Sequence, residues 1–193
     1  MRTGIVVIIA AVAAVSACAK DSPASPKVPS FNTSSAPSVA RERPVPKSCG
    51  AVVTQDEVSE ILQVAVTGQV LPIIGVPEPK IGRTARIDCY YGVPTGQDRT
   101  VAPVTVGLAN YTDETAARKR MDNTVTDDKN AGGKAGEVPV GQDRGVLLKG
   151  KQWTLVAVRG NTTVVLTVKL DLVPEEQASS LIGKLADRAL SPR

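Results

Sequence analysis

The chain of 193 residues contains no histidine, which excludes Ser-His-Asp and Cys-His catalytic sites. Zinc and copper sites normally draw on histidine or several cysteines, and only three cysteines are present. Aromatic residues make up 3% of the chain, so few side chains are available to stack on sugars. We therefore expect no catalytic residue, no cofactor and no metal. A hydrolase that uses two carboxylates stays open as an alternative, because such pairs meet only in the fold.

The basic residues are concentrated at the start of the chain. Of the 23 basic and 19 acidic residues, six and two fall in residues 1–48, which leaves 17 of each in residues 49–193. A neutral domain is a poor partner for nucleic acid, because neutralising phosphates supplies most of that affinity. We therefore expect no nucleic-acid binding. The excess of basic residues before residue 49 indicates a solvated linker. The alternative is that these residues contact the anionic headgroups of membrane lipids.

Residues 1–17 have the form of a secretory signal, with Arg2 followed by an apolar run and then small residues. The apolar run is shorter than the roughly 20 residues that a membrane-spanning helix needs. Residues 15–18, Val-Ser-Ala-Cys, resemble the bacterial lipobox, which implies cleavage before Cys18 and a diacylglycerol on its sulfur. The resemblance predicts a membrane partner through this lipid anchor at the extracytoplasmic face of the cell membrane. The alternative is an ordinary secretory leader with an incidental cysteine.

The other two cysteines, Cys49 and Cys89, form a natural pair once Cys18 carries a lipid. Outside the cytoplasm such a pair is expected to be a disulfide, with a reduced buried pair as the alternative. Residues 18–48 are rich in proline, serine and alanine and predict a disordered linker. Residues 49–193 are therefore expected to form the folded domain.

The hydrophobic pattern of that domain predicts the order α-β-β-α-β-β-β-α. A capping box, Thr54 to Glu57, opens a helix that ends before Gly68. The other predicted elements are strands at 86–91, 103–110, 146–148, 152–158 and 162–170, and helices at 112–126 and from 174 onward. This order indicates an α+β fold, an antiparallel sheet of about five strands packed against two or three helices. Residues 127–144 predict a polar glycine-rich loop.

The whole pattern resembles the actinobacterial lipoproteins with domain of unknown function 3558. The features that carry the resemblance are the lipobox leader, the Pro/Ser linker, Cys49 before the Thr54 helix, Cys89-Tyr90, and Gly141-Gln142-Asp143. The resemblance covers roughly residues 45–190. It implies a cell-envelope location and supplies no catalytic residues.

Two groups of apolar residues are candidates for a ligand site. Residues 69–80 are apolar but carry three prolines, which predicts a loop that packs under the sheet or forms a flap over a cleft. Leu71, Ile73 and Ile74 in this segment, together with Trp153, are core residues or the wall of an apolar pocket. The sequence thus predicts a non-enzymatic binding or accessory module whose partner is an envelope protein. The alternative is a carrier or sensor of an apolar small molecule or lipid.

Overall fold

The computed structural model describes residues 44–192, so the predicted signal peptide, Cys18 and most of the linker lie outside the described residues. The main elements are α1 (Cys49–Val52), α2 (Gln55–Leu62), β1 (Gln69–Gly75), β2 (Arg83–Val93), β3 (Val104–Tyr111), α3 (Glu114–Asn130), β4 (Lys134–Val140), β5 (Asp143–Lys149), β6 (Trp153–Arg159), β7 (Thr162–Val168) and α4 (Glu175–Leu190). Short 3₁₀ helices, η1 (Pro79–Ile81) and η2 (Arg99–Val101), flank β2. The predicted α+β class is confirmed.

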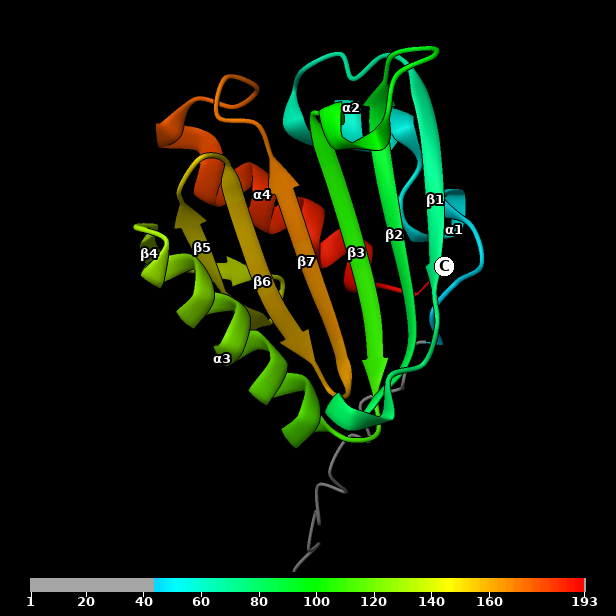
Figure 1. The fold of residues 1–193 in the computed structure, drawn as a ribbon. Coiled ribbons are helices and arrows are strands. Elements are labelled where there is room, and N and C mark those ends of the chain that lie inside the picture. The colour runs from blue at the N-terminus through cyan, green and yellow to red at the C-terminus, as the bar shows by residue number, and fades with distance from the viewer. Residues whose placement is uncertain (1–43, 193) are drawn as a thin grey trace, which may run out of the picture. The chain divides into compact units, whose positions relative to one another are not determined.

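The strands of residues 44–192 form one antiparallel sheet of seven, in the order β1-β2-β3-β7-β6-β5-β4 (Figure 1). The predicted count of about five strands is wrong, and so are the predicted element order and the limit of three helices. The two missed strands are β1, expected to be a loop, and β4, expected to lie in a glycine-rich loop. Both are edge strands, and each contains a proline, Pro72 or Pro139, of the kind that central strands exclude.

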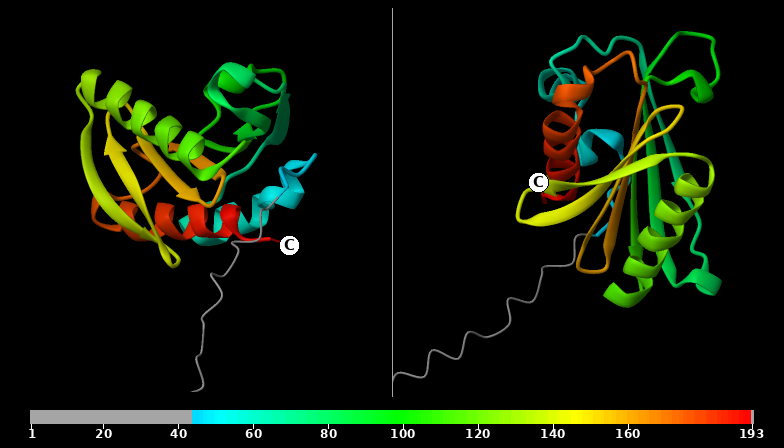
Figure 2. Two further views of the ribbon diagram at one scale, coloured as in Figure 1. Left: turned by 90° about the horizontal axis from the view of Figure 1, so that it is seen from below. Right: turned by 90° about the vertical axis from the view of Figure 1, so that its left-hand side faces the viewer.

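The sheet carries helices on both faces. Figure 2 shows α3 on one face and α4 on the other, with the sheet between them. The helices α1 and α2 lie on the α4 face, where they join the larger hydrophobic core. Helix α3 packs on β3 and β6 through a much smaller apolar cluster that includes Tyr111 and Ala117. The α3 face is therefore the less completely filled of the two.

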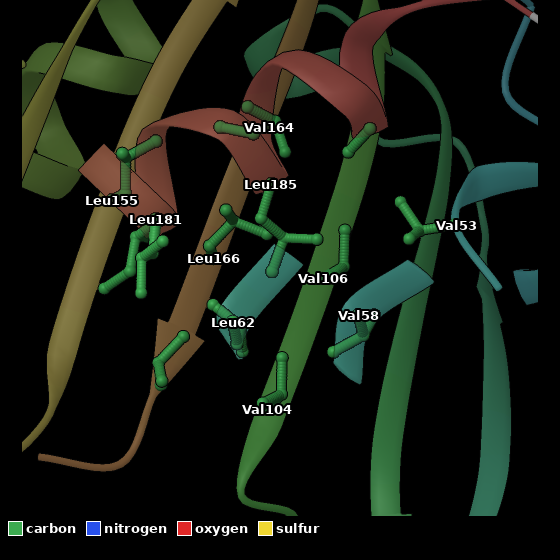
Figure 3. Packing of buried hydrophobic residues seen from close by; sticks show 14 of the residues in the cluster. Val53, Val58, Leu62, Val104, Val106, Leu155, Val164, Leu166, Leu181 and Leu185 are labelled. Atoms are coloured by element: carbon green, nitrogen blue, oxygen red, sulfur yellow. The ribbon is translucent and has the colours of Figure 1, made fainter. Parts of the chain in front are cut away.

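The larger core is built from aliphatic side chains, as the scarcity of aromatics requires. Alternate residues of the central strands, such as Val106 on β3 and Leu166 on β7, are fully buried against α4. Figure 3 shows Leu181 and Leu185 of α4 among these strand residues. At about 25 cal/mol per Å² of apolar area, this face supplies most of the hydrophobic stabilisation.

The segment that leads into the domain is attached to β2 by two contacts. Cys49 of α1 and Cys89 of β2 form a disulfide, with their Cα atoms 5.5 Å apart. The predicted bond is confirmed. Two residues further along β2, the buried hydroxyl of Tyr91 donates a hydrogen bond of 2.7 Å to the Val53 carbonyl. Both contacts fix the short α1 helix against β2.

The predicted capping box at the start of α2 is confirmed, and it reaches α4 as well. The Thr54 hydroxyl accepts from the Glu57 N–H, and the Glu57 carboxylate accepts from the Thr54 N–H at 2.8 Å. Arg188 of α4 donates to the same carboxylate at 2.9 Å. Burial by itself would raise the pKa of Glu57, but the hydrogen bonds from Thr54 and Arg188 outweigh it and lower the pKa from 4.5 to about 2.

This lowered pKa predicts an acid-sensitive contribution to stability. Because the folded pKa lies below the unfolded value, ionised Glu57 stabilises the fold above pH 4.5, and the contribution disappears as the pH falls toward 2. In urea unfolding, Glu57→Gln is expected to cost about 1 kcal/mol at pH 7 and progressively less between pH 4.5 and 2.5. Glu60→Gln, an exposed position of the same helix, is the control. A Glu57→Gln deficit that stays constant down to pH 2.5 would contradict the assignment.

Candidate functional site

A cleft of about 90 Å³ opens between α3 and the sheet. Its floor comes from β2, β3, β7 and β6, and its wall is the sheet-facing side of α3. We call it the α3 cleft. The lining residues used below are Arg86, Asp88, Gly107, Arg120 and Thr124. The cleft exists because α3 buries only small or thin side chains against the sheet, so the helix leaves space over β2 and β3.

An ion pair with a buried carboxylate and a half-buried guanidinium forms part of the floor. Asp88 is 8% exposed, and Arg86 donates to it twice, from Nε to Oδ2 at 2.7 Å and from Nη2 to Oδ1 at 2.9 Å. The hydrogen bond with Asp88, together with its negative charge, raises the pKa of Arg86 although burial opposes the change. The bidentate geometry fixes the plane of the guanidinium.

Gly107 on β3 provides the space for the Asp88 carboxylate. A Cβ atom at position 107 would lie 2.6 Å from Asp88 Oδ1, which is closer than real Cβ contacts come. Gly107 pairs with Asp88 across the β2–β3 ladder, so the absent side chain leaves the position that the carboxylate occupies. A glycine in the middle of a central strand weakens it, and this glycine is explained by the close approach.

A second cleft, of about 230 Å³, lies beside the first between η1 and α3. Its lining includes Lys80 from η1, and Lys119, Arg120 and Asn123 from α3. We call it the basic cleft. Arg120 lines both clefts, so the two are neighbours along the same helix.

Within residues 44–192, the cations of the basic cleft have no carboxylate partner within 4 Å. The nearby acid Glu78 is paired with Arg83 at 2.8 Å, and Glu114 is paired with Arg118 on the exposed side of α3. Lys80, Lys119 and Arg120 form no such pair in the described part of the chain. Since residues 49–193 are neutral as a whole, this region is a local excess of positive charge.

The predicted ligand residues are not brought together. Leu71, Ile73 and Ile74 lie on the edge strand β1, and Trp153 lies on β6, four strands away in the sheet order, or about 19 Å. Trp153 is 5% exposed and packs in the core on the α4 face. Residues 69–75 form no flap, because they pair with β2 as an edge strand, and Ile73 and Ile74 are not core, because they are 38% and 58% exposed.

The Gly141-Gln142-Asp143 segment has a structural role at the turn between β4 and β5. Asp143 accepts from Arg159 Nε at 2.6 Å, and Asp187 of α4 accepts from Arg159 Nη2 at 2.8 Å. Burial would lower the pKa of Arg159, but hydrogen bonds to Asp187 and Asp143 raise it. Gly141 has a φ of 60°, and a Cβ there would lie 2.2 Å from Asp187 Oδ1. The segment thus joins the β4–β5 turn to α4.

Sequence reasoning missed the cations that line the two clefts. The available signals were weak: Arg86 and Asp88 lie two apart on a strand and therefore share a face, and Lys119 and Arg120 are consecutive on a helix. Nothing in the sequence placed these two elements opposite each other. No group of metal-ligating side chains is found in residues 44–192, and no helix within the same range is long and apolar enough to cross a membrane.

Comparison with known proteins finds a likeness in structure but none in sequence. No family model matches the chain, and no curated protein matches it. Among solved structures, the chain is similar to the extracellular domain of PknH from Mycobacterium tuberculosis, with 13% sequence identity and a TM-score of 0.48. The alignment covers 76% of this chain and 97% of that chain. A likeness at this level carries no argument about function.

Proposed function

We propose that this protein is a non-enzymatic binding module of the cell envelope, tethered to the extracytoplasmic face of the cell membrane by a lipid on Cys18. The lipobox-like residues 15–18 and the proline-rich linker support the tether. The Cys49–Cys89 disulfide supports an oxidising compartment, because such bonds are rare in the cytoplasm. The resemblance to the domain of unknown function 3558 lipoproteins belongs to the same proposal.

The observation that carries the binding role is the pair of clefts on the α3 face. A binding site of this kind needs a concave surface and a few polar groups in fixed orientation. The α3 cleft supplies both, since its floor contains the guanidinium of Arg86 held by Asp88. Hydrolysis by carboxylates uses a pair of them, whereas Asp88 is the one carboxylate that lines this cleft within residues 44–192, and Arg86 donates to it twice. This environment favours binding over hydrolysis.

The separation of Leu71, Ile73 and Ile74 from Trp153 favours these clefts over the apolar carrier that the sequence left as an alternative. The ligand that suits the α3 face is small and polar. The same site also suits an envelope protein, if that protein inserts a polar or charged side chain into the cleft.

Filling the cleft tests this function. Thr124 lines the α3 cleft, whereas Thr126 is an exposed residue of the same helix. A pool of small molecules from the cell envelope is expected to raise the melting temperature of the full-length protein by several degrees, because a ligand that binds only the native state stabilises it. Thr124→Trp is expected to lose the shift, and Thr126→Trp to retain it. No shift in the wild type, or an equal shift in Thr124→Trp, would contradict the proposal.

A further inference from the structure

We propose that the ligand bound on the α3 face carries a phosphate group, and that Lys80, Lys119 and Arg120 bind it beside the fixed guanidinium of Arg86. This inference rests on the proposed binding function and names the chemical class of the ligand. The four cations come from three separate elements, η1, α3 and β2, and they line two neighbouring clefts that share Arg120.

The charge balance of the site favours an anion. The two clefts contain these four cations and one carboxylate, Asp88, which is already bound by Arg86. Like charges placed close together are unfavourable unless an anion compensates them. Glu78 lies two positions before Lys80 in the chain, and it pairs with Arg83 instead. Three positive charges beyond the Arg86–Asp88 pair match a dianionic phosphate better than a single carboxylate.

The donors also suit a phosphate in number and direction. A guanidinium has five N–H groups, and Arg86 uses one from Nε and one from Nη2 on Asp88. Its remaining N–H groups are held in one plane by that bidentate pair, and the side chain is 38% exposed. The neighbouring basic cleft, of about 230 Å³, adds two ammonium groups and the Asn123 amide. Several donors around one tetrahedral oxyanion are typical of phosphate recognition.

The phosphate has two possible sources, a soluble phosphorylated compound and the headgroup of a phospholipid. Both present the same oxyanion to the same cations. The proposed tether holds the domain near headgroups, so both sources need their own arm in the test.

The first arm titrates inorganic phosphate into the full-length protein in uncharged detergent at constant ionic strength, with binding measured by calorimetry. The wild type is expected to bind with a millimolar Kd. Lys119→Ala combined with Arg120→Ala is expected to weaken binding at least tenfold. Lys129→Ala combined with Lys134→Ala, which removes two exposed lysines away from the clefts, is expected to leave it unchanged. No binding by the wild type at 50 mM phosphate (about ten times the expected Kd), or equal weakening in both double variants, would overturn the inference.

The second arm separates the two sources. Residues 18–193 with Cys18→Ala, which lack both the apolar leader and the proposed lipid, are mixed with phosphatidylglycerol vesicles. Vesicle binding that inorganic phosphate displaces and the Lys119/Arg120 double variant lacks identifies a headgroup, whereas phosphate binding without vesicle binding identifies a soluble compound. If envelope molecules still stabilise the wild type but not Thr124→Trp while phosphate does not bind, the phosphate inference fails and the proposed binding function stands.

Discussion

Replacing Cys89 by alanine is expected to lower the free energy of unfolding by about 4 kcal/mol. The Cys49–Cys89 bond closes a loop across a sequence separation of 40 residues, and a loop of this length has a chain-entropy contribution of about that size. The cystine is also buried, with Cys49 and Cys89 at 5% and 0% exposure, so a single replacement leaves an unfilled space in the core. The change is a large part of the stability of a domain of this size.

Urea unfolding of the full-length protein measures this effect. Cys49→Ala, Cys89→Ala and the double variant are expected to agree within about 1 kcal/mol, because each removes the same bond. Wild-type protein treated with a reductant is the matched control and is expected to show a similar loss. A loss below about 1 kcal/mol in all three variants, with no effect of the reductant, would contradict the structural role of this bond.

Replacing Gly183 by leucine is expected to cost about 3 kcal/mol. Gly183 is buried in α4, and a Cβ there would lie 2.5 Å from the carbonyl oxygen of Pro139 on β4. The obstacle is backbone, so it cannot rotate away, and α4 has to move off the edge of the sheet. Overpacking of this kind costs about 1–3 kcal/mol, and the displaced helix also loses core contacts.

Ser180→Leu is the matched control for Gly183→Leu, because Ser180 is exposed and lies on the same helix. It is expected to change the free energy of unfolding by less than about 0.5 kcal/mol. Equal effects of the two leucines in urea unfolding would show that the close approach of α4 to β4 does not limit the size of residue 183.

The central strands were predictable because each buries alternate residues on a well-filled face. In β2, for example, Ile87, Cys89 and Tyr91 are all fully buried on the α4 side. The edge strand β1 has no buried residue, and β4 buries only Val138 and Val140 at its end, so neither edge strand shows that pattern along its length. The proline in each segment favours the prediction of a loop, because proline has no backbone N–H to donate to a neighbouring strand. An edge strand nevertheless tolerates a proline whose missing N–H would face solvent. Both segments become strands because they pair with a neighbouring strand, and this pairing cannot be recognised from the sequence of the segment alone.

Two contacts could be predicted from the sequence, but the residues that line the clefts could not. The capping box at Thr54 depends on residues three positions apart, and the pairing of Cys49 with Cys89 follows from counting cysteines. The clefts depend instead on where the crossover from β3 to β4 places α3. Only that placement brings Arg120 opposite Arg86, which lies 34 positions earlier in the chain. Local sequence patterns therefore do not predict that Arg86 and Arg120 line the same cleft.

The intact mass of the protein extracted from the membranes of the producing cell tests the central claim of a tethered extracytoplasmic domain. The expected mass is that of residues 18–193 with a diacylglycerol on Cys18 and two hydrogens fewer than the fully reduced chain, because Cys49 and Cys89 are joined. A protein recovered from the soluble fraction without a lipid, with all three thiols free, would contradict it.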